Sequence, residues 1–131
     1  MAELQVDIVT PLEKVWSGQA VSLVAPGWEG EFNVLPGHDI VLTLLRAGIV
    51  TVHIDARTSR RFVVGRGFVE AGPDRVVVLT DSADDPESVD TDAARVELDA
   101  CDAMLMVISG ADEEWRTIEA RREMAEARLQ A

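Results

Sequence analysis

Residues 30–50 read GEFNVLPGHDIVLTLLRAGIV, with the turn residues Pro36, Gly37 and His38 between two apolar runs. The run after the turn is too apolar for a surface loop, and Arg46 interrupts it well short of the ~18–20 residues that a membrane span needs. Such a stretch is either core strand folded around one sharp turn or a surface that another molecule covers. The rest of the chain has to distinguish these two interpretations.

The first two thirds of the chain have the pattern of short strands. Apolar and polar residues alternate over 4–8 and again over 50–54, and the continuous apolar run at 76–79 predicts a strand buried on both faces. Clusters of Gly, Pro, Asp and Ser separate these runs and indicate turns. About eight to ten strands at this spacing predict an antiparallel β-sandwich, which we place at residues 1–84.

The pattern changes after the polar segment SADDPESVD at 82–90. We expect a linker at 85–90 and an antiparallel two-helix hairpin at 91–131, giving a mainly β plus α fold. Ser109-Gly110 interrupts the helical periodicity, and the acids at 112–114 favour the start of a second helix. Two apolar stripes on the first helix predict that it is buried on two sides. These stripes are Val89, Ala93, Val96, Ala100, Ala103 and Val107, and Leu98, Cys101, Leu105 and Ile108. The second helix has one apolar seam, Trp115, Ile118, Ala125 and Leu129, which Arg122 interrupts.

The charge balance excludes some classes of partner. The chain has 24 acidic and 12 basic residues, a net charge of −12, which disfavours binding to nucleic acids and to anionic lipid surfaces. The start, MAELQVDIVT, has no basic segment before a long apolar run, so we expect no signal peptide. The single cysteine, Cys101, lies on an apolar stripe and cannot form an intrachain disulfide, which fits a reducing compartment.

No residues combine into a catalytic or metal site. Ser17, His38 and Asp39 are the residue types of a hydrolase triad, but the nucleophile-elbow sequence is missing. Two histidines without a cysteine cluster do not predict a metal site. The GRGF segment at 65–68 precedes a strand, so it lacks the helix N-terminus that would bind a phosphate, and a bulge or close strand approach is the better interpretation. We expect no catalytic residue and no bound metal.

Several short motifs follow one another in a distinctive order. WSG at 16–18, GEF at 30–32, VLPGH at 34–38, Gly48, GRGFVE at 65–70 and VVVLTDSA at 76–83 precede the helical hairpin. In this order and spacing they resemble the epsilon subunit of bacterial F-type ATP synthase, the counterpart of the chloroplast epsilon and mitochondrial delta subunits, over essentially the whole chain. The sequence departs from that pattern at Asn33, at Asp39-Ile40, and at Arg66, where the family usually has an unbroken glycine pair.

The resemblance implies a non-catalytic rotor subunit in the central stalk of a proton-translocating ATP synthase, peripheral to the cytoplasmic face of the inner membrane. The sandwich is then expected to bind the gamma subunit and the ring of c subunits, and to couple that ring to the catalytic head. The resemblance assigns to the c-ring a segment that comprises Glu31, Phe32, Pro36, Gly37, His38 and Asp39. It also implies that the hairpin can swing along the gamma subunit, reach the alpha and beta subunits and block ATP hydrolysis.

The resemblance leaves two features of the hairpin open. Some family members bind ATP through an Asp-x-x-Arg element, and Asp92 and Arg95 have that spacing. A gapless alignment from VLTDSA instead places Val89-Asp90 in register and leaves Ala93 at the arginine position. The first helix is acidic, so we expect weak or absent ATP binding and no cofactor. For the same reason, an acidic loop of the head would repel this helix. Any inhibitory contacts are then expected from the second helix, at Arg116, Arg121, Arg122 and Arg128.

One alternative comes from a different functional class. A free-standing β-sandwich interaction module, with a hairpin that self-associates through the first helix, would show the same strand and helix patterns. The two apolar stripes on that helix serve either interpretation.

Overall fold

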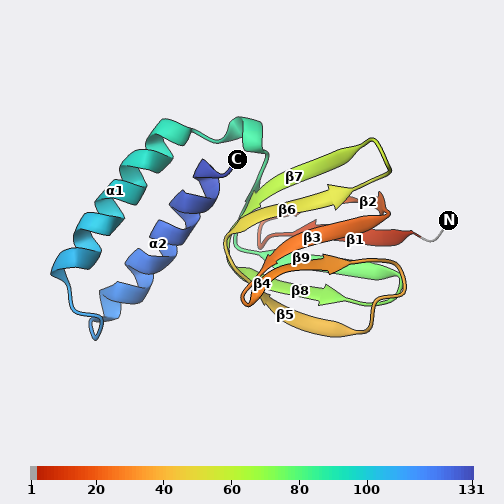
Figure 1. The fold of residues 1–131 in the computed structure, drawn as a ribbon, viewed down its shortest axis with the longest axis horizontal. Coiled ribbons are helices and arrows are strands. Elements are labelled where there is room, and N and C mark those ends of the chain that lie inside the picture. The colour runs from red at the N-terminus through yellow and green to blue at the C-terminus, as the bar shows by residue number, and fades with distance from the viewer. Residues whose placement is uncertain (1–2) are drawn as a thin grey trace.

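The computed structural model describes residues 3–131, which form a β-sandwich followed by a helical hairpin (Figure 1). The strands are β1 (Leu4–Val9), β2 (Lys14–Ala20), β3 (Ser22–Gly27), β4 (Gly30–Val34), β5 (Val41–Leu45), β6 (Gly48–His53), β7 (Ser59–Val64), β8 (Gly67–Ala71), β9 (Arg75–Thr80) and β10 (Ala83–Asp84). A 3-10 turn, η1 (Pro86–Ser88), leads to helices α1 (Thr91–Val107) and α2 (Glu113–Leu129). The expected sandwich and two-helix hairpin are confirmed.

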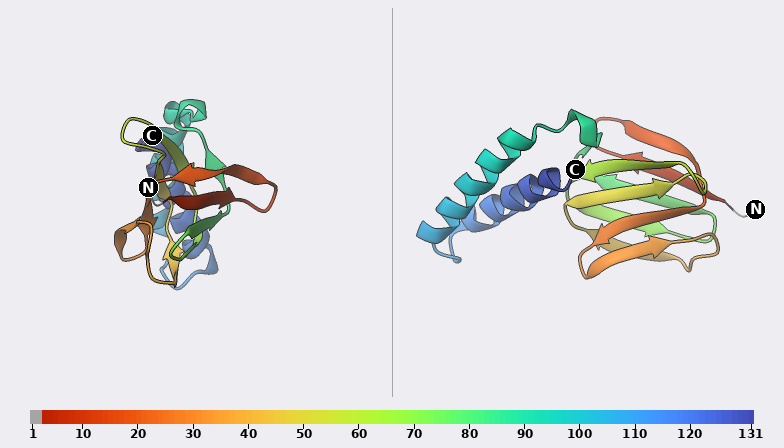
Figure 2. Two further views of the ribbon diagram at one scale, coloured as in Figure 1. Left: turned by 90° about the vertical axis from the view of Figure 1, so that its right-hand side faces the viewer. Right: turned by 45° about the horizontal axis from the view of Figure 1, so that its top comes forward.

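The strands are arranged in two layers (Figure 2). One layer contains β10, β7, β6 and β3, with β4 paired to β3, and the other contains β5, β8, β9, β1 and β2 in that order. The layers are joined where Gly27 of β3 pairs with Leu45 of β5. The strand pairs of the described chain are antiparallel apart from β1 and β9, which run parallel.

The segment at 30–50 crosses from one layer to the other. β4 pairs with β3 and β5 pairs with β8, so these two consecutive strands do not form a hairpin with each other. Gly37 in the loop between them has a φ of 88°, a left-handed conformation that L side chains rarely adopt. Its N–H donates a hydrogen bond of 2.7 Å to the carbonyl of Pro73 in the β8–β9 turn. The loop at 35–40 is thus fixed to the second layer before β5 begins.

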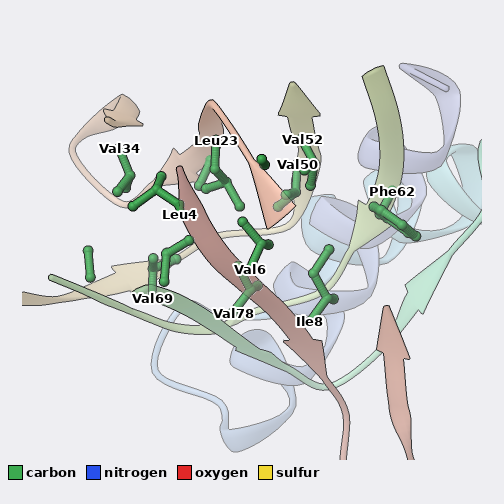
Figure 3. Packing of buried hydrophobic residues seen from close by; sticks show 14 of the residues in the cluster. Leu4, Val6, Ile8, Leu23, Val34, Val50, Val52, Phe62, Val69 and Val78 are labelled. Atoms are coloured by element: carbon green, nitrogen blue, oxygen red, sulfur yellow. The ribbon is translucent and has the colours of Figure 1, made fainter. Parts of the chain in front are cut away.

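The core lies between the two layers and is built from alternate residues of the strands (Figure 3). The buried side chains are Leu4, Val6, Ile8, Ala20, Leu23, Ala25, Val34, Leu45, Val50, Val52, Phe62, Val64, Val69, Ala71, Val76 and Val78. Each fully buried Val, Leu, Ile or Phe contributes roughly 1.5–3 kcal/mol through removal from water. This apolar contact stabilises the sandwich far more than any single polar interaction described below.

The prediction that residues 76–79 are buried on both faces is wrong. Val76 and Val78 are buried in the core, whereas Val77 is half-buried and Leu79 is exposed. A sandwich of two sheets buries only the facing surfaces, and here no helix covers the second surface of β9. The apolar side chains on that surface therefore face solvent in the described chain.

Helix α2 packs along one side of α1. Leu98 and Cys101 of α1 are buried, as are Ile118 and Ala125 of α2, and Asp90 caps α1 by accepting a hydrogen bond from the N–H of Ala93. The other apolar stripe of α1 is not covered, since its side chains Val96 and Val107 are 69% and 82% exposed. The prediction that α1 is buried on two sides is therefore wrong for the described chain, because α2 alone packs against it and the sandwich lies beyond α2 (Figure 1).

Asp7 is a nearly buried carboxylate that joins β1 to its neighbours β2 and β9. Its Oδ1 accepts a hydrogen bond of 2.6 Å from Ser17 Oγ, and its Oδ2 accepts one of 3.1 Å from the Arg75 guanidinium. The ammonium of Lys14 lies 3.8 Å away. The hydrogen bond from Ser17, aided by Gln5, Lys14 and Arg75, lowers the pKa of Asp7 although burial opposes this shift.

We expect Asp7→Asn to lower the free energy of unfolding at neutral pH by about 1–2 kcal/mol, because Lys14 and Arg75 lose the carboxylate that they pair with and Ser17 loses a charged hydrogen-bond acceptor. Since the folded-state pKa of Asp7 is depressed, its contribution is complete above the unfolded pKa and disappears as the pH falls through the folded value. Urea unfolding from neutral pH down to about pH 3 should show wild type and variant converging at the acidic end.

The matched control is Glu70→Gln, which removes an exposed carboxylate that has no ion pair within 4.0 Å in the described chain. A stability difference between Asp7→Asn and wild type that stays constant over the whole pH range would contradict the ionic role of Asp7.

Candidate functional site

An apolar row crosses the outward surface of β5, β8 and β9. The strand register places Leu44 opposite Phe68 and Phe68 opposite Leu79. These side chains are 50%, 46% and 39% exposed, and Leu42, two residues before Leu44, is exposed as well. We call the surface formed by Leu42, Leu44, Phe68 and Leu79 the outer face. Contiguous exposed apolar side chains of this kind mark interaction sites in folded proteins.

Two hollows lie side by side on the outer face, one on each side of Phe68. The first is lined by Trp28, Leu44, Leu45, Arg66, Gly67, Phe68 and Asp81, and the second by Val9, Thr10, Pro11, Arg66, Gly67, Phe68, Leu79, Thr80 and Asp81. Both are mainly apolar, with Arg66 and Asp81 as the shared charged residues. This combination suits apolar side chains of a protein partner better than a polar metabolite.

Gly67 allows β8 to approach β9 closely beside these hollows. A Cβ atom at this position would lie 1.8 Å from the carbonyl oxygen of Leu79, which no side chain could accept. The interpretation of GRGF as a close strand approach is therefore confirmed, and the segment leads directly into β8.

Arg66 connects the sandwich to the hairpin. Its guanidinium donates two hydrogen bonds of 3.0 Å, one to each carboxylate oxygen of Glu123 on α2. Glu123 Oε2 also accepts a hydrogen bond of 2.9 Å from the N–H of Ala47. The guanidinium carbons of Arg66 and Arg46 lie 5.3 Å and 5.9 Å from the ring centroid of Trp28. Burial raises the pKa of Glu123, but the hydrogen bonds from Arg66 and Ala47 outweigh it and lower the pKa overall.

The residues that the resemblance assigns to the c-ring lie in two places. Glu31 is exposed at the start of β4 and lines a hollow that also contains residues of α2. Pro36 to Asp39 form the loop that is bonded to the β8–β9 turn, at the end of the sandwich away from the hairpin (Figure 1). Phe32 packs against the core and its ring meets that of His38 edge to face at 6.2 Å. The structure therefore does not bring all six residues to one tip.

Asp92 and Arg95, the candidate nucleotide-binding pair, are both exposed on α1. A hollow beside the start of α1 is lined instead by Asp84, Ser88, Val89, Asp90, Ala93, Ala94, Glu97 and Arg128. This lining contains three carboxylates and one guanidinium, and Asp90 already caps the helix. A polyphosphate placed there would meet more negative than positive charge.

Two of the four candidate inhibitory arginines form pairs between the helices. Arg121 donates a hydrogen bond of 2.7 Å to Glu97, and Arg122 bonds Asp102 on α1 and, at 2.9 Å, Glu126 on its own helix. Arg116 and Arg128 are not fully buried, and within residues 3–131 neither has an ion pair within 4.0 Å.

Sequence reasoning missed the outer face. Its signal was present, because residues 40–45 and 76–79 are nearly continuous apolar runs rather than alternating ones. We interpreted the run at 76–79 as a strand buried on both faces, and left the run at 40–45 open between core strand and covered surface. In a two-layer sandwich without covering helices they instead indicate a surface for a partner.

Residues 3–131 contain neither a metal-binding cluster nor a membrane-spanning helix. No group of three or more His, Cys, Asp or Glu side chains is placed to hold a metal ion. Neither helix is long and apolar enough to cross a membrane.

The sequence matches known proteins along most of its length. A family model described as the β-sandwich domain of the ATP synthase delta/epsilon chain matches residues 3–86. An ATP synthase epsilon chain from Myxococcus xanthus is 38% identical over 127 residues, which cover 95% of this chain and 93% of the relative. That of Geobacter sulfurreducens is 36% identical over 131 residues, covering 99% and 94%. That of Moorella thermoacetica is 43% identical over 95 residues, covering 72% and 71%.

Solved structures share the fold. A chain of the Euglena gracilis mitochondrial ATP synthase, in a structure of its OSCP, F1 and c-ring, superposes with a TM-score of 0.83 at 22% identity, covering 97% of this chain and 79% of that one. A chain of the Tetrahymena thermophila mitochondrial ATP synthase, in a structure of its central stalk and c-ring, gives 0.64 at 11% identity, covering 97% and 94%. The whole arrangement of sandwich and hairpin therefore occurs in these structures.

Proposed function

This chain belongs to the ATP synthase delta/epsilon chain family, and we propose that it is a non-catalytic subunit of the central stalk, coupling the catalytic head to the ring of c subunits. The full-length similarity to epsilon chains supports this role. So do the subjects of the two related structures, which are an F1/c-ring assembly and a central stalk with its c-ring. As part of that complex the chain would be peripheral to the membrane, on the side of the catalytic head.

The uncovered outer face is the observation that carries this proposal. A rotor subunit without a catalytic site must hold its partner through a stable surface, and the outer face supplies apolar side chains on rigid strands. We assign this face to the gamma subunit. The loop formed by Pro36, Gly37, His38 and Asp39, together with Glu31 and Phe32, stays assigned to the c-ring through the family resemblance.

We expect the double variant Leu44→Thr with Phe68→Thr to weaken binding to the gamma subunit by about 30-fold or more, as loss of central apolar contacts does at other interfaces. Threonine preserves β propensity, so the sandwich should remain folded. Calorimetric titration of the purified gamma subunit measures the effect, and circular dichroism checks the fold.

The control for this binding experiment is Val96→Ala with Val107→Ala, which removes exposed apolar area from the hairpin. Unchanged affinity of the outer-face variant would exclude this face as the gamma site. If wild type does not bind gamma at all and instead forms dimers that the control variant abolishes, the chain is the self-associating module described above.

We propose that the hairpin does not bind ATP at micromolar concentrations. The hollow at the start of α1 carries Asp84, Asp90 and Glu97 around Arg128, and Glu97 already bonds Arg121. Calorimetric titration of the full chain with ATP should give no heat of binding below roughly millimolar concentration. A micromolar dissociation constant that is lost in Asp92→Ala or Arg95→Ala would contradict this proposal. It would support the alignment in which Asp92 and Arg95 form the Asp-x-x-Arg element.

We further propose that the hairpin inhibits ATP hydrolysis only weakly and through α2. Arg121 and Arg122 are engaged within the hairpin, which leaves Arg116 and Arg128 as the arginines of α2 without an ion pair in the described chain. Acidic residues on α1 would oppose contact with an acidic loop of the head.

Hydrolysis by a catalytic head lacking this subunit, with the full chain added back, measures that inhibition. We expect Arg116→Glu with Arg128→Glu to abolish whatever slowing the wild type produces, without loss of binding in co-sedimentation. The control Arg57→Glu reverses an exposed charge in the β6–β7 turn. If the α2 variant and the control slow hydrolysis to the same extent as wild type, α2 is not the inhibitory element.

A further inference from the structure

The hairpin meets the sandwich over a limited area. α2 contacts β6 and β7 at one end of the sandwich, whereas α1 lies on the far side of α2 (Figure 1). Between α2 and the turns β3–β4 and β5–β6 there is an open hollow, lined by residues that include Pro26, Gly30, Glu31, Ala127 and Gln130. Apolar packing is therefore incomplete at this junction, so directed polar contacts carry more of the attachment.

Glu123 makes the closest of these polar contacts. Its side chain is only 12% exposed, and it accepts two hydrogen bonds from Arg66 and one from the Ala47 N–H. Within residues 3–131, the remaining hydrogen bond between the sandwich and the hairpin joins Arg61 of β7 to the carbonyl of Gln130, just after α2, at 3.5 Å, the limit of such a bond. A nearly buried carboxylate that loses its cation is strongly unfavourable, so Glu123 leaves the sandwich if Arg66 is removed.

Contacts within the sandwich restrict the position of Arg66. The Arg66 carbonyl accepts a hydrogen bond of 3.1 Å from the N–H of Asp81, which fixes the backbone of the β7–β8 turn. Its guanidinium lies over the face of Trp28, and this contact restricts the long side chain independently of α2. Arg46 lies near the same ring and is not bonded to Glu123.

Arg66 stands between Gly65 and Gly67 in the β7–β8 turn. We propose that the bidentate pair of Arg66 with Glu123 is a latch that holds the hairpin against the sandwich and whose rupture frees the hairpin. This inference concerns the isolated chain and does not depend on the proposed role in ATP synthase.

The two helices leave together when the latch opens. The pairs of Arg121 with Glu97 and of Arg122 with Asp102 join α2 to α1. Leu98 and Cys101 of α1 and Ile118 and Ala125 of α2 are buried as well, whereas Ala127 lines the hollow beside the sandwich. Opening the latch therefore exposes the sandwich-facing side of α2 and leaves the hairpin intact.

Amide hydrogen exchange of the full chain, followed by NMR, tests the latch. The amide of Ala47 is the reporter, because its acceptor is Glu123 on α2. We expect Arg66→Met, which retains an apolar stem and loses the charge, to accelerate exchange at Ala47 by about tenfold or more. Arg66→Lys keeps the charge without the bidentate geometry and should give an intermediate rate. The matched control is Arg121→Met, which breaks a pair between the helices and should leave Ala47 unchanged.

Two results would overturn the proposal. Wild-type exchange at Ala47 in Arg66→Met would show that packing, not the ion pair, holds the hairpin. An equal acceleration across the amides that pair β8 with β9 would show that Arg66 stabilises the sheet instead of the hairpin.

Discussion

Two sheets that face each other can bury only one surface each, and much of the functional structure of this protein follows from that constraint. The loop at 35–40 takes the chain from one layer to the other, so the apolar residues of β4 and β5 enter the same core from opposite sides. The helices extend from one end of the sandwich and do not cover either sheet (Figure 2). Apolar residues beyond the capacity of the core therefore remain on the outer face. A partner would remove them from water.

The ion pairs of this protein differ in how deeply their carboxylates are buried. The chain is strongly acidic, yet many of its basic residues lie in specific pairs: Lys14 and Arg75 with Asp7, Arg60 with Asp85, Arg66 with Glu123, and Arg121 and Arg122 within the hairpin. The pairs with most exposed partners contribute little to stability. Those of Asp7 and Glu123 involve nearly buried carboxylates, so removing their partners has a larger cost. The basic residues consequently stabilise contacts between strands and between sandwich and hairpin more than they create a basic docking surface.

The sequence predicted the strands and the hairpin because those features depend on local periodicity and residue types. Alternation at 4–8 and 50–54 corresponds to β1 and β6, and the helical break at Ser109-Gly110 lies between α1 and α2. The predictions from the sequence were wrong where the burial of a side chain depends on the number of layers in the fold. The run at 76–79 and the stripe of α1 that contains Val96 and Val107 were assigned to buried surfaces, but the described chain has no further layer to cover them.

By itself, the sequence determined the order of elements, the acidic balance and the motifs that show the family, because each is written in consecutive residues or short repeats. Only the tertiary structure decided that Leu44, Phe68 and Leu79 form one surface, since they come from three strands whose register is set by hydrogen bonds between distant segments. The same is true of Arg66 and Glu123, which are separated by 57 residues. Their pairing requires the hairpin to fold back on the sandwich, and no local pattern encodes the distance between two elements that meet only in three dimensions.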